Sequence, residues 1–157
     1  MANWTQEDLI HGDSLLLYLT SGKTVVAYAT SVSIQVDSES IDTSSKFSCK
    51  WASNMGGKAG YTISADALYS SNNDGISFDK LLEMMVSGKQ VEWYMGEEAA
   101  HSGSCETNPH TLDISKTYYN GMAVVTSCSL EAGNNEIATC SITMTGAGPI
   151  QKNNSQI

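Results

Sequence analysis

The chain has 157 residues, enough for one domain with a sizeable core. Hydrophobic residues make up 41% and charged residues 16% of it, with many serines, threonines, asparagines and glycines, a balance typical of β-rich domains with wet outer faces. The formal charge of −9, with 17 acidic residues against 8 basic ones, argues against a surface that grips nucleic-acid phosphates.

The first fourteen residues lack a basic leader and an apolar run of signal-peptide length, and no later segment holds enough consecutive apolar residues to span a membrane. We therefore expect a protein made in a cytoplasm without a secretion signal and without a membrane segment. The cysteines at 49, 105, 128 and 140 have no CxxC spacing, which in a reducing compartment indicates buried or incidental thiols.

Two β segments come first. Residues 13–20 carry apolar side chains on both faces, which predicts a strand that is covered on both sides. Residues 24–37 follow a short turn as a long β pattern, and we expect it to bend near Thr30 and Ser31, where the alternation loosens.

Residues 38–58 form a polar segment with no clear period, too long for a hairpin turn between the strand patterns on either side. The segment contains Phe47, Trp51 and Met55, which would be costly to leave in water. We expect an arm that buries these side chains, and a second copy of the chain is a candidate surface. Composition gives equal weight to an alternative in which they fold back on their own domain as a satellite cluster.

After an alternating strand at 61–69 and a cluster of turn formers, residues 77–87 carry the strong helix signal of the chain. Ser77 is a suitable N-cap and Gly88 a suitable stop. The expected apolar face comprises Phe78, Leu81, Leu82, Met85 and Val86. A helix of this size cannot cover a whole sheet, so we expect it to plug one open face or end of a β-barrel or sandwich.

A strand at 90–97 and an irregular segment at 98–116 precede a predicted hairpin over 118–146 that turns at 133–135. One face of this hairpin is a nearly continuous row of small hydroxyls, and Cys128 and Cys140 are expected to be near cross-strand neighbours. We expect a single domain over residues 1–150 and a loosely ordered tail at 151–157.

Candidate chemistry is sparse. His101, Cys105 and His110 are zinc-type donors, but their spacing matches no common zinc pattern, and a solvated loop is the favoured interpretation. The chain has no GxSxG elbow, and its glycines at 56, 57 and 60 lack the order of a phosphate loop. We therefore expect no enzyme activity, no cofactor and no metal.

Five phrases stand in a distinctive order: LLLYL at 15–19, SVSIQVDSESIDTSSK at 31–46, YTISADALYS at 61–70, SFDKLLEMMVSGKQVEWYMG at 77–96, and YYNGMAVVTSCSLEAGNNEIATCSITMTGAG at 118–148. In this order the chain resembles a phage major tail tube protein of the TP901-1-like class from about Leu9 to Ile150. The resemblance implies two packed antiparallel sheets in a sandwich or barrel-like fold with one helix. It also implies rings of six copies that stack into a hollow conduit for the genome.

The resemblance further implies a virion protein that is assembled in the host cytoplasm. Its partners would be copies of itself, a tail terminator, a baseplate or distal tail protein and a tape measure protein, while DNA passes the lumen without specific binding. The helix would lie on the outer face of the sheet, through Phe78, Leu81, Leu82 and Met85. We expect the arm to make the contact between rings, through Ser40, Ile41, Asp42, Phe47, Trp51, Met55 and Lys58.

Two alternatives stay open. Tube proteins of type VI secretion and phage-like contractile injection systems share the implied architecture. A carbohydrate-binding or adhesin sandwich could use Trp4, Trp51 and Trp93 as stacking platforms for sugar rings. The missing secretion signal, the arm and the closing hairpin favour the tube.

Overall fold

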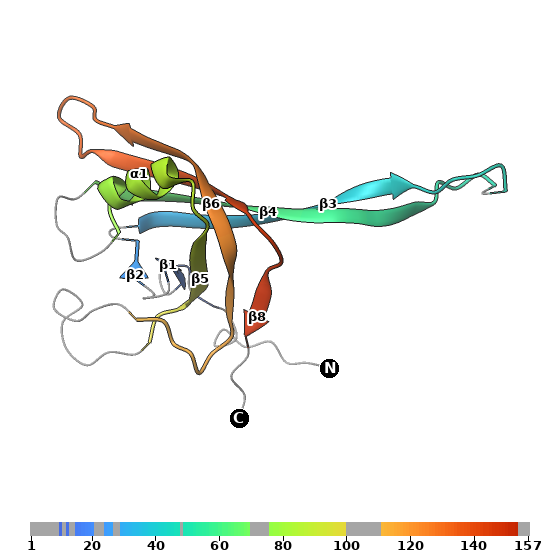
Figure 1. Cartoon of the computed structure of the whole chain (residues 1–157), viewed down its shortest axis with the longest axis horizontal. Helices are drawn as coiled ribbons and strands as arrows, with labels where there is room; N and C mark the ends of the chain where they lie inside the picture. Colours follow the sequence, from blue (N-terminus) through green and yellow to red (C-terminus); the bar gives the residue numbers. More distant parts are fainter. Residues whose placement is uncertain are drawn as a thin grey trace.

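The computed structural model describes residues 10, 12, 15–20, 24–26, 29–47, 49–69, 76–99 and 111–153. One antiparallel sheet holds eight strands in the order β2-β1-β5-β6-β7-β4-β3, with β8 paired to β6 beside this path (Figure 1). The elements are β1 Leu15–Leu19, β2 Thr24–Val25, β3 Ala29–Asp42, β4 Asn54–Leu68, α1 Phe78–Ser87, β5 Val91–Glu97, β6 Tyr118–Glu131, β7 Thr139–Gly146 and β8 Gln151–Asn153.

The predicted mainly β, barrel-like fold with one helix is confirmed, with one continuous sheet in place of the two expected. The strand β6 explains the difference, because its first half pairs with β5 and its second half with β7. The two halves of the sheet run in different directions about this strand (Figure 1), and β1 near one end of the strand order contacts β3 at the other. The sheet therefore curls around its own core.

The predicted hairpin over 118–146 and the bend near Thr30 are both present. The strands β6 and β7 pair from Ala123↔Gly146 to Glu131↔Thr139, with a register shift between Val125 and Ser127. A second shift lies between Ala29 and Ser31 at the start of β3. Cys128 pairs with Ile142, so the two hairpin cysteines are diagonal rather than direct neighbours.

Tyr61 of β4 anchors the centre of the core. Its hydroxyl donates to the Met122 carbonyl at 2.5 Å and accepts from Trp93 Nε1 at 3.0 Å. Two glycines make room for it, because a Cβ on Gly146 would lie 2.4 Å from the Tyr61 ring and one on Gly121 would lie 2.8 Å from its hydroxyl. The backbone of β6 and β7 therefore approaches this ring more closely than a side chain would permit.

The strand β1 is covered on both sides, as its sequence predicts. Leu17 and Leu19 enter the main core, while Tyr18 joins Tyr94 and Leu112 in a second cluster on the opposite face. Tyr18 is fully buried, and its hydroxyl has no hydrogen-bond partner among the described residues. Burial, with the charge of Glu98 contributing, raises the pKa of Tyr18 far above its usual range.

We expect Tyr18→Phe to leave the unfolding free energy at pH 7 within about 1 kcal/mol of the unaltered value or above it, because the buried hydroxyl has no hydrogen-bond partner in the described part of the chain. The raised pKa means that the folded protein keeps a proton that the unfolded chain releases, so stability falls above about pH 10. Tyr18→Phe should lessen this alkaline loss. Denaturant titrations at neutral and alkaline pH measure both effects, and a large loss at pH 7 would mean that the hydroxyl has a partner.

The buried face of α1 differs from the face predicted for it. Leu81 is 1% exposed and Phe78 and Met85 pack against the core. Two residues predicted for the same face are exposed instead, Leu82 at 39% and Val86 at 78%. The place of Leu82 in the packed face is taken in part by Met84. The sheet covers a narrower stripe of the helix than its apolar residues suggest, so Leu82 belongs to the outside.

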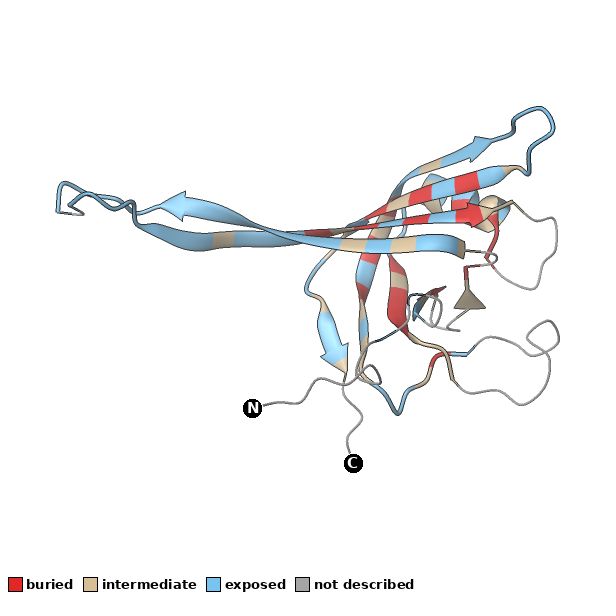
Figure 2. Cartoon of the chain, turned by 180° about the vertical axis from the view of Figure 1, so that it is seen from behind, coloured by how far each residue is buried: buried red, intermediate tan, exposed pale blue. Residues whose placement is uncertain are grey.

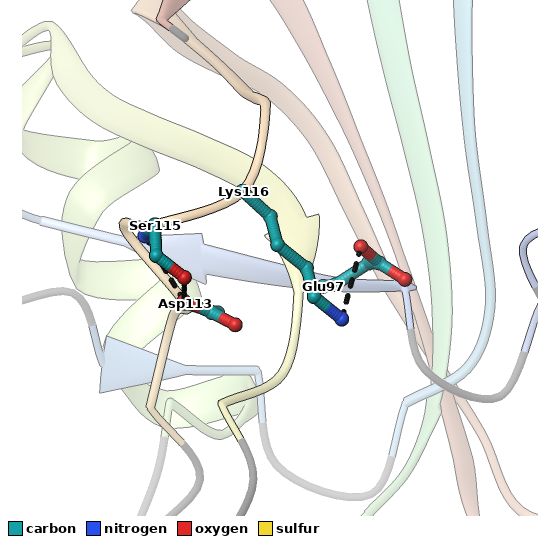
Figure 3. A network of polar contacts seen from close by, with 4 residues as sticks. All are labelled: Glu97, Asp113, Ser115 and Lys116. Carbon is teal, nitrogen blue, oxygen red and sulfur yellow. Dashed lines mark hydrogen bonds and ion pairs between the residues drawn. The ribbon is translucent and has the colours of Figure 1, made fainter. Parts of the chain in front are cut away.

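The predicted irregular segment at 98–116 returns to the sheet at both ends. Glu98 pairs with Leu112, and Lys116 forms an ion pair with Glu97 at 3.5 Å. In Figure 3 the Ser115 side chain lies against Asp113, and its hydroxyl and backbone N–H hold the pKa of that carboxyl below its usual range. His101, Cys105 and His110 lie outside the described residues.

The ordered chain extends beyond the predicted domain end at residue 150. Gln151, Lys152 and Asn153 form β8, paired with Asn120, Tyr119 and Tyr118 of β6. This strand continues along the edge of β6 that β7 leaves free, so hydrogen bonding to the sheet orders a segment expected to be loose. Residues 154–157 lie outside the described residues.

Candidate functional site

The arm is a β-hairpin, which corrects the expectation of a segment without regular structure. The strands β3 and β4 stay paired past the core as far as Asp42↔Asn54, and the hairpin projects from the body along the longest axis of the molecule (Figure 1). A register shift between Ser38 and Ser40 breaks the alternation there. This irregularity explains why the sequence pattern alone fails to reveal the strands.

Hydrogen bonds hold the tip of the arm, residues 43–53. The hydroxyls of Thr43 and Ser53 lie 2.9 Å apart, and the Ser53 backbone N–H donates to Ser44 Oγ at 2.9 Å. Hydrogen bonds from Ser44 hold the pKa of Asp42 below its usual range. The tip is therefore a turn stabilised by hydrogen bonds, although it has no core beneath it.

The large apolar side chains of the arm contact no core of their own. Phe47 is 93%, Trp51 84% and Met55 56% exposed, and Ile41, which pairs with Met55, is 45% exposed. The alternative in which they fold back as a satellite cluster is therefore wrong for this structure, and Figure 2 shows the projecting hairpin exposed almost throughout. Full burial of one such side chain contributes about 1.5–3 kcal/mol, so the arm has a strong tendency to be covered by a partner.

A second feature is the polar face of β3, β4, β7 and β6, which we call the hydroxyl wall. Cross-strand pairing aligns small polar residues in rows across the four strands, and no lysine or arginine lies in these rows. The wall comprises Ser31, Ser33, Gln35, Thr62, Ser64, Asp66, Ser141, Thr143, Thr145, Ser127 and Ser129. The hydroxyl row predicted for the hairpin is thus part of a broader surface.

Hydrogen bonds tie the wall together around Asp66. Its two carboxylate oxygens accept from Ser31 Oγ at 3.0 Å and from Ser141 Oγ at 2.6 Å, which links β3, β4 and β7. Asp66 was not among the site residues predicted from the sequence. The alternation of Thr62, Ser64 and Asp66 with apolar residues was the signal that could have found it.

The four strands of the wall end in two open edges. Among the described residues β3 pairs with β4 alone, and the Val124–Glu131 part of β6 pairs with β7 on one side only. Successive strands are antiparallel, so the strands at the two edges run in opposite directions. The β3 edge of one copy can therefore pair antiparallel with the β6 edge of a second copy, and unpaired edges favour such pairing.

The described residues contain no group of three histidine, cysteine or acidic side chains that could hold a metal ion. No helix among them is long and apolar enough to cross a membrane. Trp93 is buried and Trp51 lies on the arm, so these two described tryptophans form no shared sugar platform. Trp4 lies outside the described residues.

The family model for phage tail tube proteins matches residues 10–152. No match was found among curated proteins. The chain is similar in structure to a chain of the native gene transfer agent virion, with a TM-score of 0.71, 16% identity, and coverage of 92% of this chain and 98% of that one. In the tail of the empty gene transfer agent particle, refined with C6 symmetry, the TM-score is 0.70, with 17% identity and coverage of 91% and 98%. In the SPP1 tail tube it is 0.65, with 12% identity and coverage of 95% and 81%. At these identities the structural similarity shows the fold alone.

Proposed function

The chain belongs to the phage tail tube protein family and is a structural subunit of such a tube, and we propose that six copies close into a ring and that such rings stack head to tail into a conduit. The observation that carries this is the pair of open, oppositely directed edges on β3 and β6. A heterologous contact between them repeats around an axis and closes if the rotation fits. The C6 symmetry of the similar gene transfer agent tail supports six as the number.

Edge pairing would join the wall of each copy to the next in one continuous barrel, with the hydroxyl wall facing the bore. The core residues Ile63, Ala65 and Ile142 alternate with the wall residues on the same strands, so α1, which packs on the core, lies on the opposite, outer side. Imaging of the concentrated protein by electron microscopy, with mass measurement of the particles, tests this. Rings and tubes are expected, whereas a stable monomer or dimer at every concentration would contradict the proposal.

We expect the unaltered chain to have no measurable affinity for duplex DNA at physiological salt, because a wall of hydroxyls and carboxylates offers phosphates no cations. The double variant Ser64→Arg with Thr143→Arg, on neighbouring strands of the wall, should bind DNA in the assembled state. That binding should weaken steeply as salt is raised. Filter binding or fluorescence anisotropy over a salt series measures both, and tight, salt-sensitive binding by the unaltered tube would contradict this role for the wall.

The arm is the proposed contact between stacked rings, through Ser40, Ile41, Asp42, Phe47, Trp51, Met55 and Lys58. Its support is the exposure of the aromatic and apolar side chains on a hairpin that projects away from the body (Figure 2). We further propose a virion tail protein with no catalytic activity, assembled in the host cytoplasm. Its other partners would be a tail terminator, a baseplate or distal tail protein and a tape measure protein.

A further inference from the structure

The outer side of α1 carries an open surface strip, the α1 strip, that is apolar at its centre and acidic at its rim. Leu82 and Val86, 39% and 78% exposed, form the centre, and Asp79, Glu83 and Ser87 complete the lining. These residues recur at helical spacing and so lie along one stripe of the helix. The stripe is separate from the face that Leu81 buries in the core, so the fold of the subunit does not need it.

The tip of the arm has the complementary character. Phe47 and Trp51, 93% and 84% exposed, stand beside Lys46 and Lys50 in the sequence, and both lysines are exposed. Neither lysine forms an ion pair with a described residue. In a chain with a formal charge of −9 and only 8 basic residues, two lysines next to two bare aromatic side chains mark the tip as basic and apolar.

The two surfaces lie at opposite ends of the molecule. In Figure 1 the arm and α1 lie toward opposite ends of the longest axis, so the arm of one copy points away from its own α1. When copies stack head to tail, the arm end of one copy faces the α1 end of the next. Each copy has one tip and one α1 strip, so every tip has one strip to contact in a continuous stack.

From this match of charge and apolar surface we propose that the arm tip of one copy docks on the α1 strip of a second copy in the next ring. Phe47 and Trp51 cover Leu82 and Val86, and Lys46 and Lys50 face Asp79 and Glu83. Lys80 on the same helix already has an interaction partner of its own and is not part of this contact. The inference rests on the proposed stacked tube and names the surface that receives the arm.

A disulfide tests this contact directly, because Cys49 is an exposed native thiol between Phe47 and Trp51. In Val86→Cys, a mild oxidant such as diamide would take two electrons and two protons from Cys49 of one copy and the new thiol of the next as the S–S bond forms. Each copy has one of each thiol, so a ladder of linked chains is expected on a non-reducing gel. Val86→Cys with Cys49→Ser should give no ladder, nor should Ser129→Cys on the wall.

Charge reversal gives a second test. Asp79→Lys with Glu83→Lys, or Lys46→Glu with Lys50→Glu, should each raise the lowest concentration that forms tubes about tenfold, because like charges then meet across the contact. Combining all four changes should restore tube formation. Normal tubes from both charge variants, with no ladder from Val86→Cys, would overturn this docking contact but not the proposed tube. Failure of the unaltered chain to form tubes would instead overturn the proposed function.

Discussion

Trp51→Ala is expected to prevent the growth of tubes while leaving the thermal midpoint of the subunit unchanged. Trp51 is 84% exposed and belongs to no core of its own subunit, so its removal costs the fold little. Aromatic anchors dominate most protein interfaces, and truncation of one commonly costs about 2 kcal/mol or more. If six equivalent arms hold each ring to the next, the losses act together, and stacking should fail before ring formation does.

The measurement compares tube length by electron microscopy with the thermal midpoint by circular dichroism. Ile114→Ala is a matched control, because Ile114 is 57% exposed but lies away from the arm. It should leave both readouts unchanged. Tubes of normal length from Trp51→Ala would exclude the arm as the stacking element, and a large fall in the midpoint would assign Trp51 to the fold.

Gly146→Ala is expected to destabilise the subunit by about 1–3 kcal/mol, the range for overpacking a well-packed core. Its Cβ would lie 2.4 to 2.6 Å from three ring carbons of Tyr61, and that ring is held by hydrogen bonds to Met122 and Trp93. For a domain of this size each kcal/mol lowers the thermal midpoint by roughly 2–4 °C. Assembly should be lost at the same lowered temperature at which the subunit unfolds.

The matched control is Gly60→Ala on β4, next to Tyr61, where an added Cβ meets nothing within 4 Å. Its stability should stay near that of the unaltered chain or rise slightly. Tyr61→Phe separates hydrogen bonding from packing, because it keeps the ring and leaves Trp93 Nε1 and the Met122 carbonyl without their partner, at a cost of about 1–3 kcal/mol. A stable Gly146→Ala protein would show that the ring can shift aside.

Local patterns predicted the elements well. The helix at 77–87 differs from α1 by one residue at its start and ends at the predicted Gly88, which has the left-handed φ of 63° that suits a glycine stop. The strand at 13–20 and the hairpin over 118–146 follow from side-chain alternation and turn residues. These signals are local, so each needs only its own segment of sequence.

Features that depend on contacts between distant segments of the chain were harder to predict. The single sheet depends on β6 pairing with β5 and then β7, and nothing within the sequence of β6 specifies this change. The exposure of Leu82 depends on the width of the sheet beneath α1. The arm was predicted from a long polar segment that holds large apolar residues, while its strands were missed because the register shift at Ser38 disrupts the alternation that identifies a strand.

The continuity of β4 from the arm into the core determines how the subunit would carry a force applied to the arm. A pull on the tip of the arm runs along β4, and β4 is paired with β7 from Thr62 to Leu68. Antiparallel hydrogen bonds stand perpendicular to their strands, so this load shears the whole ladder at once rather than opening it bond by bond. Tyr61 sits where the arm enters the body and adds its side-chain hydrogen bonds to the resistance. If the arm is the contact between rings, tension between neighbouring copies would thus be carried by the geometry in which a sheet is strongest.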